Sequence, residues 1–121
     1  MEIPPADIID RLTIVKLKLE RIGDQTFKEE ISVLEEALNE FRREGIEIKQ
    51  DWIDELYKVN GDEWNLLEEM FKEKKTNNFE KIGKIYLETE LVNKRRSEIK
   101  NEIVKETGKG FKEIKKNHPS A

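Results

Sequence analysis

Eight polar residues of this sequence fall at helical spacing within stripes that are otherwise apolar, and they are the residues best placed to do chemistry. If Arg96 and Lys100 turn inward, they could bind an anion or a carboxylate, with Glu63 and nearby asparagines orienting it. The same groups could instead pair with one another and fix the register of the helices. The candidate ligand-binding residues are Asp10, Thr13, Asn60, Glu63, Thr89, Asn93, Arg96 and Lys100.

The sequence lacks the residues that several other kinds of reactive site require. There is no cysteine, which excludes disulfides, thiolate nucleophiles and metal sites built on sulfur. The one histidine, His118, lies near the C-terminus, so the Glu-x-x-His repeats of di-iron bundles are missing. Glu44 and Glu47 have the spacing of a magnesium-binding pair, but they straddle Gly45 in an expected turn. We therefore predict neither a metal ion nor a cofactor.

The pattern of apolar residues predicts four helices joined by short turns. Prolines occur only at positions 4, 5 and 119, and no stretch alternates between apolar and polar residues as a half-buried strand does. Pro5 suits the first turn of a helix, and Gly23 suits the end of that helix. The predicted helices span residues 5–22, 26–44, 51–75 and 79–107.

The pair Asn60-Gly61 lies in the middle of the third predicted helix and could interrupt it, because this dipeptide favours turns. The apolar residues decide against a break, since those on both sides of the glycine occupy one angular sector of a continuous helix. We therefore predict one helix through Gly61. The apolar residues concerned are Trp52, Ile53, Leu56, Val59, Leu66, Leu67, Met70 and Phe71.

We predict an all-α fold, an antiparallel up-down-up-down helical bundle over residues 1–107, followed by a basic, flexible tail over residues 108–121. The third and fourth helices form a longer C-terminal hairpin, so part of it must remain uncovered within one chain. Leu87 and Leu91 lie one turn apart on the outer face of the fourth helix and are candidates for an interface. We therefore expect a homodimer.

The polar residues are expected to meet at one level of the bundle. If the third and fourth helices fold back on each other near residues 76–77, Asn60 lies opposite Asn93. The first helix carries apolar residues on more than one face, which predicts neighbours on two sides. Its polar pair, Asp10 and Thr13, would then join the same layer.

Charge and hydropathy restrict the partners. Charged residues make up 41% of the chain while the net charge is only -4, so acids and bases are interleaved as on solvated helices. Residues 94–116 carry an excess of Lys and Arg, but Glu98, Glu102 and Glu106 interrupt the run at helical spacing. Nucleic acid is therefore not an expected partner. There is no apolar run long enough to span a membrane and no signal peptide, so we predict a cytoplasmic protein without a membrane partner.

Three blocks of the sequence, IIDRLTIVKLKLERI, VNGDEWNLLEEMF and VNKRRSEIKNEIV, resemble blocks of a family of short bacterial all-helical proteins classed as a domain of unknown function. The blocks of that family read like LIDKITILEIKLERI, VNxxLWxIEDxIR and TNDxRxxLKxxIN. Lys16 and Lys94 stand where the family has acidic residues, and Gly61 where it has another residue. The resemblance implies which residues matter but implies no activity. The matching residues are Asp10, Thr13, Lys18, Arg21, Asn60, Trp64, Glu68, Asn93, Arg96 and Lys100.

The first helix also resembles the IDxxDxxLLxLLxxR opening of small all-α chorismate mutases. Those enzymes bind a dicarboxylate with basic residues and a Glu or Gln, but the remainder of their pattern is missing here. The residues that could take these roles are Arg11, Lys18, Arg96, Lys100 and Glu63. Whether the chain is an enzyme stays open. We predict a helical binding or interaction module with a buried polar layer, and the alternative is a small-molecule site for an anion or carboxylate.

Overall fold

The computed structural model describes residues 2–111 and 113, and this part of the chain contains four α-helices and no strand. The helices are α1 (Pro5–Ile22), α2 (Phe27–Arg43), α3 (Gln50–Thr76) and α4 (Phe79–Thr107). Their bounds agree with the predicted ones to within one residue at each end. The predicted all-α bundle with a longer C-terminal hairpin is confirmed. Of the predicted tail, residues 112 and 114–121 lie outside the described residues.

Helix α4, which carries two of the candidate basic residues, has well-defined ends. The Asn78 side chain accepts a hydrogen bond from the backbone N–H of Lys81 at 3.2 Å and so caps the first turn. At the other end, Gly108 adopts the left-handed conformation (φ 69°), and its N–H donates to the carbonyl of Val104. None of the four helices is long and apolar enough to cross a membrane, as judged on the described residues.

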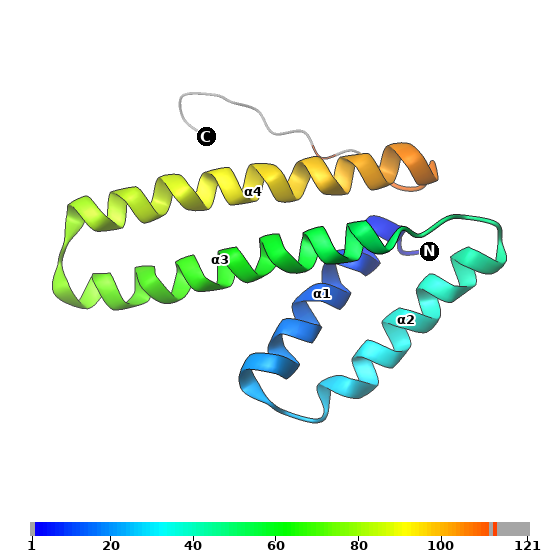
Figure 1. Ribbon diagram of the computed structural model, residues 1–121, viewed down its shortest axis with the longest axis horizontal. Helices are drawn as coiled ribbons and strands as arrows, with labels where there is room; N and C mark the ends of the chain where they lie inside the picture. Colours follow the sequence, from blue (N-terminus) through cyan, green and yellow to red (C-terminus); the bar gives the residue numbers. More distant parts are fainter. Residues whose placement is uncertain (1, 112, 114–121) are drawn as a thin grey trace.

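The four helices form two antiparallel hairpins of unequal length (Figure 1). The shorter hairpin, α1 and α2, crosses the longer hairpin, α3 and α4, obliquely near the open end of the longer one. Helix α1 packs against all three other helices, whereas α2 packs along α1. The far half of the α3–α4 hairpin therefore extends beyond the shorter hairpin (Figure 1).

The central position of α1 explains why its sequence is apolar on more than one face. Ile9 and Val15 are fully buried, and Leu12 is 1% exposed. The surrounding helices contribute residues such as Leu56 and Ile99 to the same core. A helix covered on several sides keeps only a narrow polar stripe, and in α1 this stripe includes the exposed Asp7 and Arg11. The buried residues of α1 are Pro5, Ala6, Ile8, Ile9, Asp10, Leu12, Thr13, Val15 and Leu17.

Helix α3 runs through Gly61 without a break, as predicted, and this glycine lies where α1 crosses α3. A Cβ atom placed on Gly61 would lie 3.6 Å from Cδ2 of Leu17 and 3.7 Å from Nη2 of Arg21. Both distances are ordinary van der Waals contacts. Gly61 is therefore compatible with the crossing but not required by it.

We expect Gly61→Ala to raise the free energy of unfolding by about 0.5–1 kcal/mol, because alanine fits the space and restricts the unfolded chain. Gly23→Ala is the matched control, since Gly23 has φ 82° and alanine there should cost about 1 kcal/mol. Urea denaturation of both variants measures the two changes. A loss of stability in Gly61→Ala would contradict the packing described at the crossing.

Candidate functional site

A buried carboxylate, Asp10, joins α1 to α3 and α4. The guanidinium of Arg96 donates one hydrogen bond to Asp10 Oδ1 at 3.0 Å and a second to Oδ2. The side-chain amide of Asn60 donates to the same Oδ1 at 3.0 Å and to the hydroxyl of Thr13 at 2.9 Å. The Thr13 hydroxyl in turn donates to the backbone carbonyl of Asp10 at 2.8 Å. Three helices thus meet in one polar network, which we call the Asp10 network.

Lys100 connects this network to Asp7 at the start of α1 and to Glu113, which follows α4. Its Nζ lies 4.0 Å from Asp10 Oδ2, 3.1 Å from Asp7 Oδ1 and 2.8 Å from Glu113 Oε1. The backbone N–H of Glu113 donates to the side chain of Asn101 at 2.6 Å, so this residue of the predicted tail lies against α4. The ammonium group is therefore paired with carboxylates of the protein itself.

The charges of the network hold each group in its ionised form. Burial alone would raise the pKa of Asp10, but hydrogen bonds from Arg96 and Asn60, with the charges of Arg96 and Lys100, lower it below its ordinary value. Burial opposes the charge of Lys100, yet its bonds to Glu113 and Asp7 raise its pKa overall. The network is thus a set of mutually stabilised charges and contains no group whose pKa is brought near neutrality.

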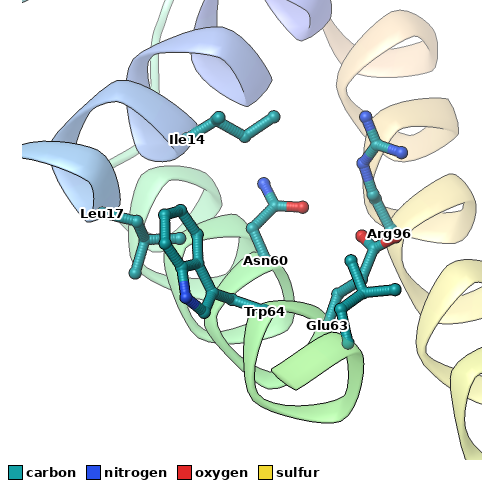
Figure 2. Close-up of a pocket in the computed structure, with 7 residues that line it drawn as sticks. Ile14, Leu17, Asn60, Glu63, Trp64 and Arg96 are labelled. Carbon is teal, nitrogen blue, oxygen red and sulfur yellow. The ribbon is translucent and has the colours of Figure 1, made fainter. Parts of the chain in front are cut away.

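An open cavity of about 380 Å³ lies beside the network, where α1, α3 and α4 meet (Figure 2). Figure 2 shows Ile14 and Leu17 reaching it from α1, Asn60, Glu63 and Trp64 from α3, and Arg96 from α4. Most of this wall is apolar. The complete lining is Ile14, Leu17, Asn60, Glu63, Trp64, Leu67 and Arg96.

The two charged residues of the cavity wall differ in their pairing. Arg96 directs its hydrogen bonds to Asp10, outside the cavity. Glu63 is half-buried, and in the described part of the chain no side chain donates a hydrogen bond to its carboxylate. Its charge contributes to raising the pKa of Arg96. Glu63 is therefore the charged group of this wall whose carboxylate accepts no side-chain hydrogen bond among the described residues.

The structure brings together most of the predicted site residues and separates two of them. The Thr89 hydroxyl donates to the carbonyl of Ile85 at 2.9 Å, so it serves its own helix rather than the site. Asn93 is half-buried and does not line the cavity. Glu63 belongs to the cavity wall but not to the Asp10 network. The predicted residues that form the network are Asp10, Thr13, Asn60, Arg96 and Lys100.

The alignment of Asn60 with Asn93 across the hairpin stays a prediction, and the side chain of Asn60 finds its hydrogen-bond partners on α1. Asn60 donates its hydrogen bonds to Asp10 and Thr13 of α1. The reason is that α1 packs against both α3 and α4 at this level, so its side chains reach the polar groups of the hairpin first. The other expectation, that α1 contributes its polar pair to the layer, agrees with these bonds.

Sequence reasoning missed the apolar wall of the cavity and two of the acids around Lys100. In the sequence, Leu17 and Trp64 look like ordinary core residues and Ile14 lies outside the main apolar stripe of its helix, so spacing alone does not place them around one cavity. Asp7 lies one turn before Asp10, so its approach to the same layer was foreseeable from helical spacing. No sequence signal places Glu113 there, because a loop separates it from α4.

Leu87 and Leu91, the predicted interface pair, are 60% and 68% exposed. Leu91 also lines a shallow groove with Leu66 and Val92 on the hairpin. Their exposure agrees with the expectation of an outer face.

Comparisons with protein-family models, with curated proteins and with solved structures found no match to this chain. The resemblance to the bacterial family of unknown function therefore stays a prediction. Among the residues described, no three His, Cys, Asp or Glu side chains come close enough to hold a metal ion.

We expect Asp10→Asn to lower the free energy of unfolding at neutral pH by about 2–3 kcal/mol, because the partly buried Arg96 loses its counter-ion. The pKa of Asp10 is lowered by folding, so its stabilising effect is present above its unfolded pKa. The effect disappears as the pH falls through the folded pKa, below about pH 4. The loss of stability on acidification should therefore be smaller in the variant. Urea denaturation from neutral pH down to about pH 2 measures both effects.

Asp7→Asn is the matched control, because Asp7 pairs with the same Lys100 but its side chain is 54% exposed. Its removal should cost less than about 1 kcal/mol. Equal losses in the two variants would contradict the central role of Asp10.

Proposed function

We propose that this chain is a helical interaction module that binds a second copy of itself through the uncovered half of the α3–α4 hairpin. The observation that carries the proposal is a set of large apolar side chains left exposed on that half. They are Leu67 (56% exposed), Phe71 (66%), Phe79 (76%) and Tyr86 (56%). We call these four residues the distal face.

Helical spacing places the distal face on the side of the hairpin that α1 covers nearer the open end. On α3, Leu67 and Phe71 continue the stripe that begins at Asn60 and Trp64, in steps of four and three residues. On α4, Tyr86 and Phe79 continue the stripe of Arg96 in the same way. The distal face is thus the same side of the hairpin beyond the part that α1 covers, where its four side chains are left exposed.

The area of this surface suits a dimer. Four side chains of this size, each more than half exposed, offer about 500 Å² of mostly apolar surface per copy. A contiguous patch of a few hundred Å² or more is unusual for a monomer. A standard interface buries about 800 Å² per partner, and polar residues at the rim supply the remainder.

The charges beside the distal face favour two copies in antiparallel orientation. Glu68 lies at its inner end, where it accepts a hydrogen bond from the Trp64 indole at 2.7 Å. Lys75 lies at its tip, with Nζ 4.9 Å from the centre of the Phe71 ring. A twofold axis through the face brings Lys75 of each copy toward Glu68 of the other. Self-complementarity of this kind is what a symmetric dimer requires.

The pairing of the basic residues gives less support to an anion site. Arg96 and Lys100, the cations on which that alternative depends, are already bound to Asp10, Asp7 and Glu113. The Asp10 network instead fits the role of a scaffold that holds α1 at the base of the hairpin.

We expect Phe71→Glu to convert a dimer into a monomer, because a carboxylate at the centre of the distal face would be desolvated in the interface. Sedimentation equilibrium over a range of concentrations measures the mass of both proteins. Phe71 is 66% exposed in the single chain, so the variant should keep its fold, which circular dichroism checks.

Leu91→Glu serves as the matched control, since Leu91 is equally exposed but lies on the other side of α4. It should leave the dimer intact. A monomer for Leu91→Glu and an intact dimer for Phe71→Glu would move the interface to Leu87 and Leu91. A monomeric wild-type chain at all concentrations would refute the proposal.

A further inference from the structure

We propose that the cavity between α1, α3 and α4 binds an ammonium or guanidinium group carried on a short apolar stem. This inference goes beyond the proposed dimer, because the cavity is built from a single chain. It rests on three properties of the wall: the Glu63 carboxylate, to which no described side chain donates a hydrogen bond, the apolar residues around it, and the size of the cavity.

The charge of the cavity favours a cation. Glu63 presents a carboxylate that no described side chain satisfies, and the only base of the wall, Arg96, is held by two hydrogen bonds to Asp10. Bringing an anion to this wall would place it next to Glu63 without freeing Arg96. A cation would instead form a charge-assisted hydrogen bond with Glu63. The side-chain oxygen of Asn60 is a second acceptor on the same wall, because the amide nitrogen of Asn60 is the donor to Asp10 and Thr13.

The remainder of the wall favours an apolar stem. Ile14 and Leu17 of α1 and Trp64 and Leu67 of α3 all line the cavity. Figure 2 shows Ile14, Leu17 and Trp64 grouped on one side of the cavity, away from Arg96. The indole ring of Trp64 already has the guanidinium of Arg21 over it, 5.6 Å from the ring centre, so this ring accepts cations in the folded chain. A ligand with one charged end and one apolar end would therefore match the wall along its length.

The size of the cavity limits the ligand to a small one. A volume of about 380 Å³ holds roughly ten atoms at about 30 Å³ each, which is enough for an amine with a stem of about six carbons. Because the cavity is open on one side, the ligand could be a free amine or the side chain of a lysine. In both cases the wall binds the same group, an ammonium on an apolar stem.

The test compares three probes of equal length on the full chain: hexylammonium, hexanol and hexanoate. We expect hexylammonium to bind with a dissociation constant on the order of 1 mM, hexanol about tenfold more weakly, and hexanoate more weakly still. Binding is followed by the indole N–H resonances, of which there are two. The signal of Trp64 should move, whereas that of Trp52, 3% exposed in the core, should not.

Glu63→Gln should weaken hexylammonium about tenfold and leave hexanol unchanged, because only the charge is removed. Glu69→Gln is the matched control, since Glu69 is exposed on the same helix and does not line the cavity. Blocked lysine, with both backbone ends capped, is the fourth probe. Tighter binding of blocked lysine than of hexylammonium identifies a protein side chain as the ligand, and the reverse order identifies a free amine.

Equal binding of hexylammonium and hexanoate, or an unchanged affinity in Glu63→Gln, would overturn the cation site. The measurement is repeated in Phe71→Glu, whose substituted residue does not line the cavity. If Phe71→Glu still binds hexylammonium, ligand binding does not depend on the dimer. Either proposal can therefore fail without the other.

Discussion

The bidentate ion pair between Asp10 and Arg96 is the interaction on which the arrangement of the helices depends. Asp10 is only 6% exposed, so its charge must be neutralised where it stands. Arg96 from α4 and Asn60 from α3 can reach it together only when α1 lies across both helices at one level. A sliding of any of the three helices by one turn would leave a buried charge or amide without a partner. The network therefore selects one packing among those that the apolar residues alone would allow.

The difference in helix length then divides the long hairpin into a covered part and an exposed part. Near the open end of the hairpin, α1 covers the stripe that contains Asn60 and Arg96. Farther along, the same stripe continues through Leu67 and Phe71, which no residue of the described part of the chain covers. The cavity lies between the part of the hairpin that α1 covers and the exposed part. Ile14 and Leu17 of α1 line it. One geometric fact, a short helix laid across a long hairpin, thus produces the network, the cavity and the distal face.

Helical periodicity was sufficient to predict the helices and to predict that Asn60 and Arg96 point inward, because both properties follow from the spacing of residues along a single helix. It was insufficient to predict their partners. Pairing across the α3–α4 hairpin can be counted from the turn, whereas the angle at which α1 crosses depends on side-chain packing that no single helix encodes. Thr89 shows a second limit. A hydroxyl in an apolar sector can bond to its own backbone, so its position alone does not indicate a site.

The net charge around Arg96 and Lys100 could not be predicted from the sequence of one helix either. From the sequence, Arg96 and Lys100 on one face of one helix suggest a site for an anion. In the folded chain they meet Asp7 and Asp10 from α1, Glu63 from α3 and Glu113 from beyond α4, so two bases stand among four acids. The acids come from three different segments. Asp10 and Glu63 were predicted site residues, but their meeting with Arg96 and Lys100 depends on how the segments pack. Because electrostatic character is a sum over every element that reaches a site, the charge around Arg96 and Lys100 is negative overall. Their two positive charges are therefore compensated within the chain and do not by themselves favour an anion.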